Sequence, residues 1–138
     1  MTLPAAWALQ VGLRSHLGAS AALATHLGSP PRIYDRVPED AIFPLLTIGE
    51  SRIRPLDGRD QAMEHDIRLN AWSRWGGHKE LREIADAVHD ALHDADFTVD
   101  GFDVISTRFV FADMFRQPES DTYQAVMRYR IVTDRTAE

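Results

Sequence analysis

The chain has 138 residues, of which 44% are hydrophobic and 26% charged, and this is the size and composition of one globular domain. It contains no cysteine, which excludes disulfide bonds, thiolate metal sites and cysteine nucleophiles. The formal charge of −6 leaves no basic footprint of the kind that DNA-binding domains show, and no apolar run approaches the roughly 20 residues of a membrane span.

The negative charge is unevenly distributed along the chain. Residues 1–75 carry eight basic and eight acidic side chains, whereas residues 76–138 carry seven basic and thirteen acidic ones. All basic residues except Lys79 are arginine, a side chain suited to ion pairs at interfaces. The start of the chain has no basic segment ahead of an apolar one, so no secretory signal is expected.

Two helices are predicted in the first 27 residues. Pro4 suits the first turn of a helix, and apolar residues follow it at helical spacing: Trp7, Val11, Leu13 and Leu17. A second, shorter helix over residues 19–27 ends at Gly28, because Pro30 and Pro31 cannot continue it.

Three strands are predicted next. Residues 32–37 form a short edge strand that ends at Pro38, and residues 43–54 form a longer one. Residues 61–75 alternate, with His65, Ile67 and Leu69 on one face and Asp66 and Arg68 on the other, which is the period of a half-buried strand. The turn at Asp57-Gly58 should join the last two strands in a hairpin with an exposed tip.

A helix and two further strands complete the prediction. Residues 78–94 are amphipathic, with Leu81, Ile84, Val88 and Leu92 in one stripe. Residues 104–113 and 121–133 are predicted as strands joined by a loop that contains Pro118. The fold class is therefore α+β: one domain over residues 1–138, with an antiparallel-dominated sheet of about four to five strands and helices 4–27 and 78–95 packed on one face.

Histidines provide the strongest candidates for chemistry. His89 and His93 lie four residues apart on one predicted helix with Asp86 nearby, a spacing that can hold a metal ion in a small hydrolase. Asp90 stands where metalloprotease helices have glutamate, and no third ligand is evident, so solvated helix histidines are the simpler interpretation. His65 is expected in the core or an interface. No catalytic residue, cofactor or metal is therefore predicted, and the chain is not expected to be an enzyme.

The order of short motifs resembles the tail-completion, or tail-terminator, proteins of long-tailed phages and gene transfer agents. The resemblance spans about the whole chain and is carried by Arg32-Ile33-Tyr34-Asp35, Val37-Pro38, the run from Phe43-Pro44 to Ile48-Gly49, the strand end Asn70-Ala71-Trp72-Ser73-Arg74, and Gly76-Gly77 before the amphipathic helix. It departs at Leu45, where the family often has an aromatic residue.

The resemblance implies a structural role without a cofactor. Such proteins form a ring, usually hexameric, on the last ring of the tail tube, stop its polymerisation and meet the head connector, while DNA passes through the lumen without specific binding. The implied partners are further copies of the chain, the tail-tube protein and the connector, with no membrane, and the implied location is the head–tail joint of a phage-like particle, or the bacterial cytoplasm before assembly. A neighbouring stopper or adaptor ring is the alternative.

Residues that project from the predicted sheet are expected to make the contacts. They are Arg52, Arg54 and Arg59 at the hairpin tip, Trp72, Arg74 and Trp75 at the strand end, and Arg116 in the loop. The arginines of the tip are expected to meet the acidic helix face of a neighbouring copy, near Asp86, Asp90 or Asp94. Such partly exposed pairs are worth up to about 1 kcal/mol each, so they would set register more than affinity.

Overall fold

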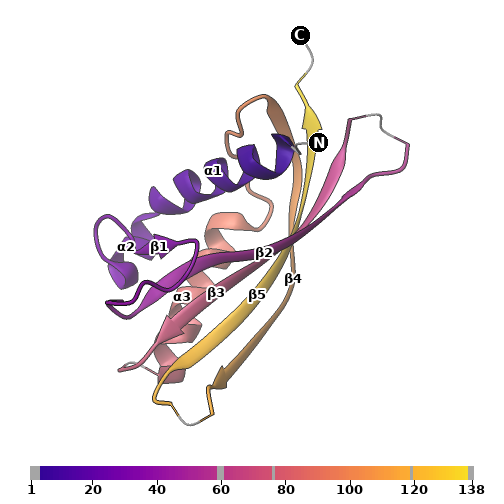
Figure 1. Cartoon of the computed structure of the whole chain (residues 1–138). Coiled ribbons are helices and arrows are strands. Elements are labelled where there is room, and N and C mark those ends of the chain that lie inside the picture. The colour runs from indigo at the N-terminus through magenta and orange to yellow at the C-terminus, as the bar shows by residue number, and fades with distance from the viewer. Residues whose placement is uncertain (1–3, 59–60, 76, 119, 137–138) are drawn as a thin grey trace.

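The computed structural model describes residues 4–58, 61–75, 77–118 and 120–136. Its helices are α1 (Pro4–Gly18), α2 (Ala21–Leu27) and α3 (Gly77–Leu92). Its strands are β1 (Ile33–Tyr34), β2 (Leu45–Pro55), β3 (Met63–Ser73), β4 (Phe102–Arg116) and β5 (Tyr123–Arg135). The predicted α+β class is confirmed, and each predicted element is present with shifted ends (Figure 1).

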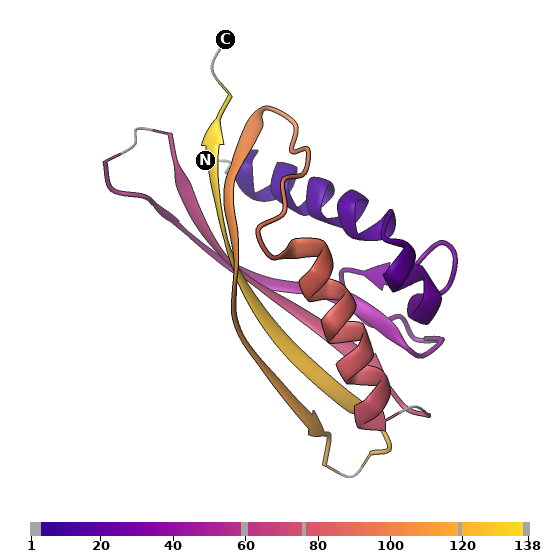
Figure 2. The same ribbon diagram turned by 180° about the vertical axis from the view of Figure 1, so that it is seen from behind.

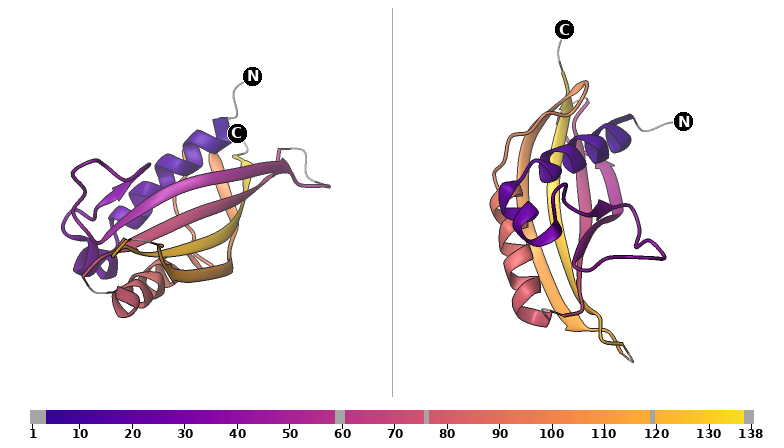
Figure 3. Two further views of the ribbon diagram at one scale, coloured as in Figure 1. Left: turned by 60° about the horizontal axis from the view of Figure 1, so that its bottom comes forward. Right: turned by 90° about the vertical axis from the view of Figure 1, so that its left-hand side faces the viewer.

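The five strands form one open sheet in the order β1-β2-β3-β5-β4. Only β1 runs parallel to its neighbour, pairing through Ile33 and Tyr34 with Leu46 and Thr47, and the other pairs are antiparallel. Strand β5 is inserted between β3 and β4, so the long strand β4 forms one edge of the sheet. The strands twist strongly along their length (Figures 1 and 3).

The helices cover one face of the sheet (Figure 2). The predicted stripe of α3 is confirmed, since Leu81, Ile84, Val88 and Leu92 are fully buried against the inward side chains of β3 and β5. Burial of each such side chain contributes about 1.5–3 kcal/mol. The predicted alternation of β3 is also confirmed, because Ile67, Leu69 and Ala71 belong to this core.

The predicted apolar side of α1 is wrong in part. Leu9, Leu13 and Leu17 face the core and are at most 1% exposed, whereas Trp7 and Val11 are 65% and 50% exposed. Leucines at i, i+4 and i+8 form the buried stripe, and Trp7 and Val11 lie on another side of the same helix. Gly12 allows α1 to approach the loop after α3, since a Cβ atom there would lie 2.6 Å from the Thr98 carbonyl oxygen.

No helix in the part of the chain that the structure describes is long and apolar enough to cross a membrane.

Candidate interaction surfaces

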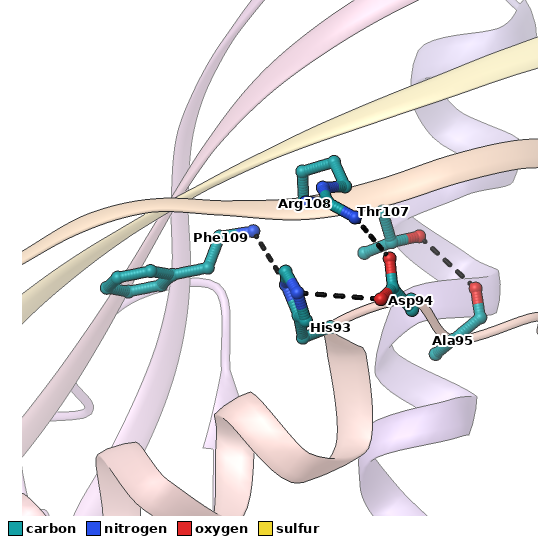
Figure 4. A network of polar contacts seen from close by, with 6 residues as sticks. All are labelled: His93, Asp94, Ala95, Thr107, Arg108 and Phe109. Atoms are coloured by element: carbon teal, nitrogen blue, oxygen red, sulfur yellow. Dashed lines mark hydrogen bonds and ion pairs between the residues drawn. The ribbon is translucent and has the colours of Figure 1, made fainter.

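The predicted histidine pair fastens the end of α3 to the sheet, with His89 in the last turn of the helix and His93 directly after its end at Leu92. The rings of His89 and His93 stack with centroids 4.7 Å apart and planes 15° apart, and His89 also meets the edge of Phe109. His93 Nδ1 accepts the backbone N–H of Phe109 at 3.2 Å, while its Nε2 lies 3.6 Å from Asp94 Oδ2 (Figure 4). Arg108 donates to Asp94 at 2.8 Å, and the backbone N–H of Asp94 donates to the Thr107 carbonyl.

This arrangement does not suit a metal ion. Stacked rings direct their nitrogens side by side rather than towards one point, and Nδ1 of His93 already accepts a hydrogen bond. The described residues contain no group of three or more potential ligands. The two histidines therefore act as packing contacts between α3 and β4.

His65 is a core residue, as expected. It is 1% exposed, and its Nε2 lies in hydrogen-bonding distance of Thr133 Oγ1, at 2.9 Å. Burial lowers the pKa of His65 to about 4, because the charged imidazolium would lose its hydration.

The interaction residues expected from the sequence lie at two ends of the sheet. Arg52 and Arg54 lie on β2 towards the β2–β3 hairpin, and Arg59 lies outside the described residues. Arg54 is engaged within the chain, because it donates to Glu64 at 2.9 Å. Asp94, one of the three expected acidic partners, is likewise paired with Arg108.

The other end of the sheet carries the remaining expected residues. Trp72 is half-buried and donates through Nε1 to Thr47 Oγ1, whereas Trp75 is 89% exposed. Arg74 donates to Thr122 Oγ1 and lies 4.2 Å from the ring centre of Phe43. Arg116 ends β4, donates to the Ser120 carbonyl and lies 3.7 Å from Asp121. We call Trp72, Arg74, Trp75 and Arg116 the strand-end surface.

Strand β4 presents an apolar surface that the sequence analysis missed. The strand is 15 residues long, and among the described residues it pairs on one side only, with β5. It carries half of the exposed large hydrophobic side chains of the described chain: Ile105, Phe109, Val110, Phe111 and Phe115. We call these five residues the β4 edge. The sequence did contain a signal for this surface, because the apolar residues of β4 do not strictly alternate with polar ones. A strand with one buried face would show polar residues at every second position.

Two bulges bring two of the five apolar side chains of the β4 edge to solvent. The pairing with β5 shifts register between Val104 and Ser106 and between Phe109 and Phe111. The extra residues are Ile105 and Val110, which are 46% and 49% exposed. Edge strands are usually protected by charged side chains or short length, and β4 has an apolar residue at each bulge instead.

The two layers of the molecule differ in charge. The exposed side of α3 carries Glu83, Asp86 and Asp90. The opposite face of the sheet, which has no helix on it in the described chain, carries Arg68, Arg128 and Arg130 on adjacent strands. Part of the acidic excess of residues 76–138 thus lies on α3, and most of the rest lies in loops and on β4 and β5.

Comparison with solved structures supports the fold. A chain from the "Virion of native gene transfer agent (GTA) particle" superposes with a TM-score of 0.85 at 23% sequence identity, covering 96% of this chain and 99% of its own length. A second solved structure, which carries no functional name, superposes with a TM-score of 0.55 at 10% identity over 96% of this chain and 97% of its own. At these identities the likeness concerns the fold alone, and no curated protein matches the chain in sequence.

The family model described as "Tail completion protein gp17" matches residues 11–134, which include α2, α3 and every strand through nearly all of β5. The match spans most of the chain and agrees with the motifs that suggested the resemblance. The chain therefore belongs to the tail completion protein gp17 family, whose members are structural and not enzymes.

Proposed function

We propose that this protein completes the tail of a phage or gene transfer agent particle by closing into a ring, in the expected case a hexamer, on the last ring of the tail tube. The ring stops tube growth and offers its other side to the head connector. The family assignment supports the tail role. The observation that carries self-association is the β4 edge, a long open strand with apolar side chains on it.

The unpaired backbone N–H and C=O groups of an open strand edge are satisfied best by hydrogen bonds to another strand. The other edge of the sheet offers one. On the side of β2 that faces away from β3, β1 pairs only with Leu46 and Thr47, and the rest of that side of the 11-residue strand is open in the described chain. The β4 edge of one copy meeting the β2 edge of the next is a heterologous contact, and heterologous contacts close into rings when the rotation between copies allows it. Burial of the five apolar side chains stabilises such a contact.

The two ends of the sheet then point to the two neighbours of the ring. We assign the strand-end surface to one neighbour, tube or connector, and the hairpin end with Arg52, Arg54 and Arg59 to the other. Trp75 supports this assignment, because a tryptophan that is 89% exposed in the single chain is typical of the centre of a protein interface. A stopper or adaptor ring would use the same surfaces with different neighbours, so the ring that each end touches distinguishes the two roles.

The self-association proposal is tested at the bulges of β4. The double variant Ile105→Lys with Val110→Lys places two charges on the β4 edge, where they should block pairing with a second strand. The control is Glu83→Lys, which changes the net charge by the same two units at an exposed side chain of α3, away from both edges of the sheet.

We expect both variants to keep the circular dichroism spectrum of the wild type. In particle assembly, the β4 variant should give over-long or headless tails and lose at least tenfold in particle yield, while the control should stay near wild type. Normal tails joined to heads at wild-type yield with the β4 variant would overturn the edge contact. Normal tails in the complete absence of the protein would overturn the tail-completion role itself.

A further inference from the structure

Three arginines lie together on the helix-free face of the sheet. Arg68 on β3 is directly opposite Arg128 on β5, and Arg130 follows two residues later on β5. They alternate with Leu69, Met127 and Tyr129, which belong to the core, so their side chains leave the sheet on the other side. We call these three residues the arginine cluster.

The chain neutralises this cluster only in part, and Asp66 on β3 is directly opposite Arg130. Asp66 is the one acid paired with it in the described residues, at 3.3 Å from Arg128. Arg68 donates to the neutral Asn70 at 3.4 Å. Arg130 is also directly opposite Arg108, whose guanidinium is engaged by Asp94. Like charges directly opposite each other destabilise a sheet, so an external anion would stabilise this face.

The spacing of the cluster suits a polyanion. Neighbouring strands lie about 4.8 Å apart and residues i and i+2 of a strand about 6.8 Å apart, so the three guanidinium groups can reach separate anionic groups on one ligand. Guanidinium binds phosphate through two parallel hydrogen bonds. The acidic side of α3 lies in the opposite layer, which directs a polyanion to the sheet face and away from the helices.

We propose that the arginine cluster binds the phosphate backbone of double-stranded DNA without reading its sequence. The inference rests on the proposed function, because a ring around the tail lumen is what brings this face to DNA. The occupant is DNA rather than the acidic α3 of a second copy, because the β4 edge already supplies a contact between copies that leaves the sheet face uncovered. Three contacts per copy bind weakly, and a ring multiplies them.

The test measures binding of a fluorescent 25-base-pair duplex by anisotropy in about 20 mM salt, followed by a salt titration. Each phosphate contact contributes about −0.9 to the slope of log K against log salt, so three contacts predict a slope near −3. The variant Arg68→Gln with Arg130→Gln removes two contacts and should bring the slope to about −1 and weaken binding at least tenfold at low salt.

The matched control is Lys79→Gln with Arg82→Gln, which removes the same two positive charges from exposed residues of α3. We expect this control to keep the wild-type slope and to bind within about threefold of the wild type. A wild-type protein that does not bind at up to 100 µM, or two variants that weaken binding equally, would overturn the proposal.

A third result would also overturn it. If Arg68→Gln with Arg130→Gln changed the sedimentation of the protein without DNA and left DNA binding intact, the face would contact another copy of the chain. None of these results depends on the β4 edge, because neither variant used in the duplex measurements alters a residue of that edge. Failure of the DNA proposal is therefore distinguishable from failure of the ring proposal.

Discussion

At the scale of single residues, the groups that seemed suited to chemistry in the sequence have structural roles. His89 and His93 stack on each other and fasten α3 to β4, and His65 lies in the core beside Thr133. The sequence placed His65 correctly, because it shares the face of Ile67 and Leu69 in an alternating strand. It did not show that His93 accepts the N–H of Phe109, because that contact joins two elements 16 residues apart.

His65 should make the protein less stable in mild acid. Its pKa is lowered to about 4 in the folded state, against 6.5 when unfolded, so between these values the unfolded chain binds more protons. Stability should therefore fall as the pH drops from about 6.5 to 4, by roughly 3 kcal/mol in total, and this contribution should level off below pH 4. Urea unfolding at several pH values measures the effect, and His65→Gln should remove this part of the slope. An unchanged slope in that variant would assign the effect to other groups.

Tyr129 offers a change that should not destabilise the protein. Its side chain is 1% exposed, and its hydroxyl has no hydrogen-bond partner among the described residues. Burial and the nearby charge of Asp90 raise its pKa, so the hydroxyl stays neutral. Tyr129→Phe removes an unsatisfied polar atom and should leave the free energy of unfolding unchanged or raise it by up to about 1 kcal/mol. A loss of more than 1 kcal/mol in urea unfolding would show that the hydroxyl has a partner.

At the scale of elements, periodicity predicted what each segment is, and packing decided which side it buries. The stripe of α3 and the alternation of β3 agree with the structure because each has one buried side. Helix α1 has apolar residues on more than one side, and only the position of the sheet shows that Leu9, Leu13 and Leu17 are the buried ones.

Gly12 should be required in α1, although glycine is unfavourable inside a helix. Alanine is favoured over glycine within a helix by about 1 kcal/mol, but a Cβ atom at Gly12 would lie 2.6 Å from the Thr98 carbonyl oxygen and 3.1 Å from Val99 Cγ2. Gly12→Ala should therefore lower the free energy of unfolding by about 1–3 kcal/mol. Gly18→Ala is the control, because its Cβ would meet nothing within 4 Å. Thermal or urea unfolding of both variants measures the effect. Equal stabilities of the two variants would contradict the close approach of α1 to the loop after α3.

At the scale of the whole molecule, the sheet has distinct edges, ends and faces, and each suits a different contact. The β4 edge suits a neighbouring copy, the two sheet ends suit the rings above and below, and the arginine cluster suits DNA. The strand-end surface should therefore act in joining the tail to the head and not in self-association.

A variant at the strand-end surface separates these roles. Trp75→Ser with Arg116→Ser should lower the yield of joined particles at least threefold, because it removes the most exposed aromatic side chain and a neighbouring cation from one sheet end. The sedimentation of the purified protein should not change. A change in self-association with normal joining would move this surface to the contact between copies.

The sequence by itself determined the class of the fold, the order of the elements and the family, because helix stripes, strand alternation and short motifs are local properties of the chain. The tertiary structure decided the surfaces. Arg68 and Arg128 are 60 residues apart in sequence and become neighbours only because β5 pairs with β3, and the summed charge of −6 conceals their cluster. The apolar character of β4 becomes an exposed edge only because β5 lies between β3 and β4, and the pairing of distant strands is a long-range outcome that no local pattern contains.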